Sequence, residues 1–406
     1  MRNLEERGTL GALSSEVLPF LQVGAVNEPL LPNLRTLKLW PAPGKFIPLI
    51  PSFLSPRTTL INIGFDEPDL PKAVIASMVT TFPILCPNLK EITLRPLPRD
   101  PMITTGVSGM LLATNRNTLQ RFHVDSPLTE GREVIYKLPN LRELSAVIEG
   151  DTSLPSAVLP YLTSLTITCD HGHGWLQMFH GATFGKPSPL SSNRAALAVS
   201  TQNTLSWLYL HTSCSWNPSY TSLLPFTQMK YLEIRFSCRN GCSSSVDDDI
   251  LTKLVRAMPK LENLQLGDAP CCRIPIGVTA KGLVALTHHC PNISFLCIRF
   301  QVASLSAPPA TAGVTSNAEF TPRRDCALTE LDVGAISVPE ESVLTVAPTL
   351  AHIFPRIESI NYVEDENWDM VEGTISLSRE IINYSSKQSP PLVHCTPATD
   401  YPLQNG

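Results

Sequence analysis

The sequence predicts an α/β solenoid, in which short parallel strands form one curved sheet and helices cover its other face. The first observation is a spacing of large apolar residues at offsets 0, 3 and 5, as in LPNLRTLKLW, which recurs about every 29 residues. We place it twelve times, and about twelve irregular repeats are therefore expected. The segments begin at Leu34, Leu60, Leu89, Leu119, Leu141, Leu162, Leu205, Met229, Leu261, Ile293, Leu328 and Ile357.

The second observation is a proline two residues before the first apolar position. It occurs in seven of the twelve segments, at Pro32, Pro87, Pro139, Pro160, Pro259, Pro291 and Pro355. Proline cannot continue a helix and disfavours helix at the residue before it. Each proline therefore marks the end of one element and the start of a strand with inward-facing alternate side chains.

The third observation is a run of residues with helical apolar spacing before several of these prolines. Ile250, Leu251, Leu254 and Val255 form such a run before Pro259. The acidic stretch Asp247–Asp249 precedes this run and is typical of a helix start. One strand and one helix per repeat describe a solenoid.

These residues resemble the leucine-rich-repeat family. Segments such as CPNLKEITL and GLVALTHHCPNISFLCI are similar to the cysteine-containing variety common in F-box proteins. The run LLPNLRTLKLW resembles the start of the repeats in F-box-like families of mushroom-forming fungi. The segment Leu13–Leu18 only echoes the opening of an F-box, so the resemblance covers the repeats and no F-box is seen.

The repeats divide the chain into three parts. Residues 1–31 are expected to form an N-terminal helical cap, and residues 32–375 the solenoid. The solenoid is interrupted by a long loop at about 168–204 and by an Ala/Ser/Pro/Thr-rich insertion at about 301–322, expected to be disordered. Residues 376–406 are expected to form an unstructured tail.

Composition narrows the partners and the compartment. The net charge is −5, and no basic run exceeds a pair, so neither nucleic acid nor a membrane surface is an expected partner. No stretch approaches about 18 apolar residues, so no membrane span is expected. The eleven cysteines are odd in number and irregularly spaced, which favours reduced thiols in a cytoplasmic or nuclear protein.

Two groups of Cys and His residues could in principle bind a metal ion, but the sequence gives little support for a metal site at either group. The first group, which could also include Cys214, does not have the spacing of a structural zinc site, so we interpret it as part of a polar loop. Its members are Cys169, His171, His173 and His180. The second group falls in loops of neighbouring repeats, where a metal site, a disulfide or free thiols remain open. Its members are Cys238, Cys242, Cys271 and Cys272. No catalytic or cofactor-binding motif is present, so we predict no enzyme activity and no cofactor.

The candidate site is the concave face of the sheet. Strand side chains at offsets 2, 4 and 6 should point away from the core. Parallel stacking then places Trp207 beside Tyr231, Tyr209 beside Glu233, and His211 beside Arg235. Tyr, Trp and Arg are enriched in binding hot spots; the alternative is that these aromatic residues pack under adjacent loops. The candidate residues are Trp40, Arg95, Arg121, His123, Trp207, Tyr209, His211, Tyr231, Glu233, Arg235, Phe295 and Arg299.

Three functions are therefore considered. The leading hypothesis is a protein-binding solenoid with a protein substrate on the concave face. The family resemblance implies a substrate receptor of a cullin–RING ubiquitin ligase, which would bind a Skp-type adaptor and a cullin only if an F-box lies upstream. The second is a leucine-rich-repeat scaffold or inhibitor unrelated to ubiquitin. The third is a metal-dependent or hydrolytic enzyme built on the loop at 168–215.

Overall fold

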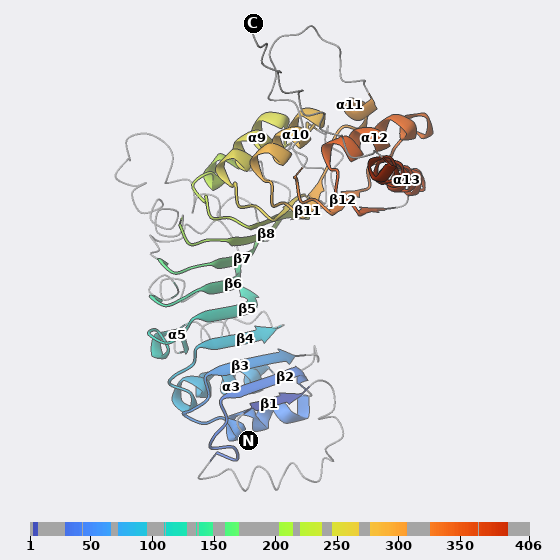
Figure 1. Ribbon diagram of the computed structural model, residues 1–406. Helices are drawn as coiled ribbons and strands as arrows, with labels where there is room; N and C mark the ends of the chain where they lie inside the picture. Colours follow the sequence, from blue (N-terminus) through green and yellow to red (C-terminus); the bar gives the residue numbers. More distant parts are fainter. Residues whose placement is uncertain are drawn as a thin grey trace, which may run out of the picture.

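The sheet is continuous and entirely parallel. In the computed structural model, the described residues are 3–6, 29–42, 44–65, 72–95, 109, 111–127, 135, 138–148, 159–169, 203–213, 220–237, 246–267, 277–306, 325–363 and 365–388. Within them, thirteen strands pair in chain order from β1 to β13. Figure 1 shows the strands stacked as successive rungs. The strands are β1 Asn3–Glu6, β2 Thr36–Ala42, β3 Leu60–Phe65, β4 Glu91–Arg95, β5 Arg121–Pro127, β6 Glu143–Ile148, β7 Ser164–Cys169, β8 Trp207–Ser213, β9 Tyr231–Ser237, β10 Asn263–Leu266, β11 Phe295–Ile298, β12 Glu330–Gly334 and β13 Ser359–Tyr362.

Helices cover one face of this sheet near its N-terminal and C-terminal ends, and the core lies between the two layers there (Figure 1). Parallel strands need a crossover connection, and the described helices provide it in these two parts. Two helices, Asp248–Ala257 and Ala280–His289, begin with side-chain caps: Asp247 accepts from the N–H of Ile250 at 2.8 Å, and Thr279 accepts from the N–H of Lys281 at 3.2 Å. The helices are η2 Gly44–Leu49, α2 Ile50–Phe53, α3 Lys72–Leu85, α5 Leu112–Thr114, η4 Tyr220–Leu223, α9 Asp248–Ala257, α10 Ala280–His289, α11 Val302–Ser306, η6 Glu340–Ser342, α12 Val343–Ile353 and α13 Asn367–Gln388.

A repeated backbone contact sets the stacking of the repeats. The residue before each strand and the first residue that pairs with the preceding strand both donate their N–H to one carbonyl of the preceding repeat. Thr59 and Leu60, for example, donate to the carbonyl of Arg35 at 2.8 and 3.1 Å. The same pattern recurs at all eleven junctions from β2 to β13. This contact gives the backbone N–H groups at the start of each strand an acceptor, so they do not need one from water.

Eleven of the twelve predicted segments lie in the predicted register, and the segment at Leu60 is wrong by two residues. Leu60 pairs with Thr36, which is two positions after Leu34, so Thr58 occupies the first core position of this repeat. Thr58 is buried because its hydroxyl donates to the carbonyl of Leu34 at 3.1 Å and accepts from the N–H of Ser55 at 3.1 Å. Pro56 lies two residues before Thr58. This repeat therefore has the expected proline, although its first core position is not apolar.

The N-terminal cap differs from the prediction of a helical segment over residues 1–31. Its first described element is the strand β1, which pairs in parallel with β2 from Asn3 opposite Thr36. The sheet therefore continues one strand beyond the first recognised repeat. Residues 7–28 of the predicted cap lie outside the described residues.

The predicted tail from residue 376 is wrong over its first part, because α13 continues to Gln388. This helix closes the C-terminal end of the solenoid. Trp368 is fully buried and donates its indole N–H to the carbonyl of Ile336 at 2.6 Å. Glu372 accepts from the N–H of Ile360 in the edge strand β13 at 3.0 Å. A side chain thus satisfies a donor on an edge that would otherwise be open to pairing.

The predicted disordered insertion at 301–322 is wrong over its first residues, and the predicted loop at 168–204 falls largely on residues that are not described. Val302–Ser306 form α11, because Val302 and Leu305 pack into the core and the Ser304 hydroxyl accepts from the N–H of Ala280 at 3.1 Å. Residues 307–324 lie outside the described residues. Of the loop at 168–204, Thr168 and Cys169 belong to β7, Asn203 and Thr204 belong to a turn, and residues 170–202 are not described.

Candidate protein-binding face

The candidate site lies on the face of the sheet opposite the helices, which we call the open face. Side chains of alternate strand residues point to this face, while their neighbours enter the core. The predicted cross-strand neighbours are confirmed: Trp207 pairs with Tyr231, Tyr209 with Glu233, and His211 with Arg235. Two groups of side chains are arranged along the open face.

The first group, the aromatic cluster, consists of Trp207, Tyr209, Tyr231, Glu233 and Arg235 on β8 and β9. The rings of Trp207 and Tyr231 are parallel, and their centroids are 3.6 Å apart. Trp207 remains 44% exposed, so part of the indole ring faces solvent and does not enter the core. A large, rigid aromatic surface of this kind is typical of a binding anchor.

A buried carboxylate organises the polar side of the aromatic cluster. The side chain of Glu233 is only 3% exposed, and it accepts hydrogen bonds from the Tyr231 hydroxyl and the Arg235 Nε. Burial, followed by the hydrogen bond to Glu233, raises the pKa of Tyr231, so this phenol stays protonated. Gln265 on β10 donates to the same hydroxyl at 3.2 Å. The hydrogen bonds thus fix the Tyr231 ring against Trp207.

Arg235 also contacts Tyr209 within the aromatic cluster. Its guanidinium carbon lies 5.8 Å from the centroid of the Tyr209 ring, which is within cation–π distance. The arginine is exposed while its Nε is held by Glu233. The cluster therefore combines a fixed aromatic surface with one exposed cation.

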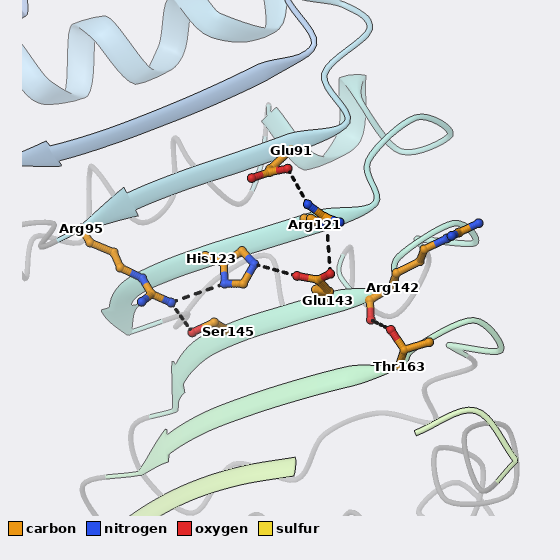
Figure 2. Close-up of polar contacts among 8 residues, drawn as sticks. All are labelled: Glu91, Arg95, Arg121, His123, Arg142, Glu143, Ser145 and Thr163. Carbon is orange, nitrogen blue, oxygen red and sulfur yellow. Dashed lines mark hydrogen bonds and ion pairs between the residues drawn. The ribbon is translucent and has the colours of Figure 1, made fainter. Parts of the chain in front are cut away.

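The second group, the charge network, lies on β4, β5 and β6 (Figure 2). Arg121 bridges two carboxylates of neighbouring strands, with 3.1 Å to Glu91 and 3.0 Å to Glu143. Adjacent strands place these three side chains in one row, since Glu91 pairs with Arg121 and Arg121 with Glu143. Charges of alternating sign stabilise the row, although each exposed pair is worth only about 0–1 kcal/mol.

A second row of the charge network is centred on Arg95. This arginine lies 3.2 Å from Asp125. It also donates to Ser145 at 2.9 Å and to Nδ1 of His123 at 3.4 Å (Figure 2). Burial and then the nearby Arg95 lower the pKa of His123, which favours the neutral ring. Burial raises the pKa of Asp125, and Arg95 opposes this effect. The residues of this network mainly satisfy one another.

The remaining predicted residues lie apart from these groups. Trp40 is 49% exposed and lies across β3, where a Cβ on Gly64 would come within 2.4 Å of the indole. Phe295 lies on β11 and pairs with Asn263 on β10, the strand that also carries Gln265. Arg299 follows the end of β11. The cysteine group at 238–272 and the histidines at 171–180 lie outside the described residues.

The prediction omitted several polar residues that complete these groups. Glu91, Glu143, Ser145 and Gln265 all occupy open-face strand positions, yet they were not selected as site residues. The alternation of Glu91, Arg121 and Glu143 in one row was a usable signal. Among the residues that the structure describes, no group of three or more His, Cys, Asp or Glu is arranged to hold a metal ion. No helix in the described part is long and apolar enough to cross a membrane.

Comparison with known proteins shows no family for this chain. No family model matches the sequence, and no curated protein matches it. A solved structure titled as the complex of Rad7 and Elc1 in yeast matches with 13% sequence identity and a TM-score of 0.41. The match covers 88% of this chain and 85% of that chain. The chain is an α/β solenoid of the leucine-rich-repeat type. At 13% identity, we take no function from this complex.

Proposed function

We propose that this protein is a non-catalytic protein-binding solenoid, which holds its partner on the open face at the aromatic cluster. The stack of Trp207 on Tyr231 supports this proposal, because it leaves a large apolar ring exposed in a fixed orientation. Glu233 holds Tyr231 and Arg235 in place before any partner arrives. Pre-organised side chains lose little conformational freedom on binding, which favours affinity.

The finer proposal concerns the class of partner. The motifs CPNLKEITL and GLVALTHHCPNISFLCI resemble those of F-box leucine-rich-repeat proteins, and this likeness supports a substrate receptor of a cullin–RING ubiquitin ligase. The open face would then hold the protein substrate, and an F-box upstream of the repeats would bind the Skp-type adaptor and, through it, the cullin. The second candidate is a leucine-rich-repeat scaffold or inhibitor, which would use the same face without an adaptor.

Affinity capture with quantitative mass spectrometry tests the role of the aromatic cluster. The tagged wild type is compared with W207A/Y231A and with the control I84A/L344A, which removes two exposed apolar side chains from helices. Hot-spot residues contribute about 2 kcal/mol or more each, so we expect at least a tenfold loss of the main partner from the first variant. The control should retain it. An unchanged partner in W207A/Y231A would exclude the cluster as the binding site.

The ubiquitin-ligase proposal needs a separate test on the complete gene product. We expect a Skp-type adaptor and a cullin to co-purify with it in constant ratio, and the W207A/Y231A substitutions to leave that ratio unchanged. Recovery of a partner protein without adaptor or cullin would instead support the scaffold or inhibitor. The two proposals can therefore fail independently.

A further inference from the structure

A row of exposed cations lies along one edge of the N-terminal half of the solenoid. The turns that lead into β2, β3, β4 and β6 each contribute one exposed cationic side chain. We call this row the basic edge. Its members are Arg35, Arg57, Lys90 and Arg142.

The backbone holds three members of the basic edge in equivalent positions. The carbonyls of Arg35, Lys90 and Arg142 each accept two N–H groups from the following repeat, at 2.7–3.1 Å, so the turns stack in step with the strands. Neighbouring strands are about 4.8 Å apart, and four steps from the first repeat to the fifth therefore span about 19 Å. This length matches about six residues of extended peptide at about 3.3 Å per residue.

The basic edge contains no carboxylate in its described turns, residues 29–35, 54–59, 86–90, 115–120 and 138–142. Glu91 and Glu143, which directly follow two of these turns, both bind Arg121 on the open face. Figure 2 shows the side chain of Arg142 extending away from that network. Arg57 donates to Asn33 at 2.6 Å, a neutral partner that leaves its charge unchanged.

The same edge is different in the C-terminal half. There Lys230 forms an ion pair with Glu262 at 2.7 Å, which neutralises its charge. Among the described residues, the basic edge therefore belongs to the first five repeats, although the whole chain has a net charge of −5.

We propose that the basic edge binds an extended acidic segment of a partner protein. A narrow peptide can follow the row of turns and place carboxylates against successive cations. Nucleic acid fits less well, because its wider backbone would also bring phosphates over Glu91, Asp125 and Glu143 on the adjoining open face, and because the chain is acidic overall. This surface is separate from the aromatic cluster, so the inference holds whether or not that cluster binds a substrate.

Fluorescence anisotropy with defined probes tests this proposal. The probes are a labelled oligoglutamate peptide of about eight residues, an oligoglutamine peptide of equal length and a single-stranded oligothymidine. Titrations at about 50 and about 150 mM NaCl measure how strongly salt weakens binding, as expected for contacts between exposed charges. The edge variant carries R35Q, R57Q, K90Q and R142Q; the control removes the same number of exposed charges from the C-terminal half through K230Q, K253Q, K260Q and K281Q.

The oligoglutamate peptide should bind the wild type, and the edge variant should lose at least about tenfold in affinity, since four ion pairs of modest strength are removed. The control should lose less than about threefold, and the oligoglutamine peptide should not bind. Equal losses in both variants, or no binding of oligoglutamate at low salt, would overturn the proposal. Tighter binding of oligothymidine through the same four residues would assign the edge to nucleic acid instead. If the edge variant fails to fold, the double variant K90Q/R142Q replaces it. With two of the four substitutions, it should lose about threefold in affinity, half of the expected change in binding free energy.

Discussion

Trp368 fixes the terminal helix α13 to the last repeats, and its replacement provides a sharp test of how the solenoid ends. Its ring is fully buried and lies edge-on to Phe300, with 6.3 Å between centroids. Its N–H donates to the carbonyl of Ile336 at 2.6 Å. The substitutions W368A and W368F remove these contacts to different extents.

The magnitudes follow from the contacts. Truncating a buried tryptophan to alanine costs about 3–5 kcal/mol through lost burial and the remaining cavity. W368F keeps an aromatic ring but leaves the Ile336 carbonyl without its partner, which costs about 1–3 kcal/mol. M370A serves as the control, because Met370 lies on the same helix and is 44% exposed; it should change stability by less than about 0.5 kcal/mol.

Hydrogen–deuterium exchange of α13 and β13 is the suitable assay, since a solenoid end can open without global unfolding. W368A should accelerate exchange of these backbone amides by about 100-fold or more, W368F by about tenfold, and M370A by no measurable factor. Exchange in the strands β4–β8 should be unchanged. Wild-type protection of α13 in W368A would refute the assignment of this helix as the C-terminal cap.

Further predictions concern individual buried or partly buried groups. T58V removes the hydroxyl that donates to the Leu34 carbonyl, so the urea midpoint should fall by the equivalent of about 1–3 kcal/mol; stability equal to wild type would contradict the role of Thr58. The pKa of His123 is lowered in the folded protein, so as pH falls through 6.5 the unfolded chain takes up the proton first and stability decreases. H123Q should therefore lose less stability than wild type between about pH 7.5 and 5.5, and an equal loss in urea titrations would argue against it. Burial raises the pKa of Cys290 to about 12, so iodoacetamide should label this thiol at about pH 8 only in urea; native labelling at the same rate would show that the thiol is accessible.

The order of the strands could be predicted from the sequence because each repeat carries two independent signals. The apolar spacing alone is degenerate, but the preceding proline or asparagine fixes where a helix or turn must end. The repeat at Thr58 shows the limit of the apolar signal. There a hydrogen-bonded threonine replaces leucine, and only Pro56 marks the true start.

The two ends were harder to predict, since their stability depends on contacts distant in sequence. α13 has a mixed composition, and what holds it is the burial of Trp368 and the contact of Glu372 with the edge strand β13. β1 has no apolar repeat pattern of its own and is defined by its pairing with β2. Such elements are stabilised by tertiary contacts that local propensity does not record.

The sequence was sufficient to predict which residues of the candidate site are neighbours. It was less informative about the polar residues that hydrogen-bond to them. The alternation of side chains along parallel strands, together with the repeat register, was sufficient to place Trp207 beside Tyr231. The role of Glu233 was not evident, because its burial results from the neighbouring Tyr231 and Arg235. Charged residues are rarely buried without partners, so this carboxylate depends on the whole arrangement.

Hydroxyl-radical footprinting of the protein with its captured partner tests most directly whether the partner binds at the aromatic cluster. Trp207 is 44% exposed, so we expect it to be oxidised in the free protein, while the exposed Leu344 on α12 provides an internal reference on the helical face. We predict that the partner protects Trp207 and Tyr231 from oxidation and leaves Leu344 unchanged. Unaltered oxidation of Trp207 in a saturated complex would contradict the assignment of the aromatic cluster as the binding site.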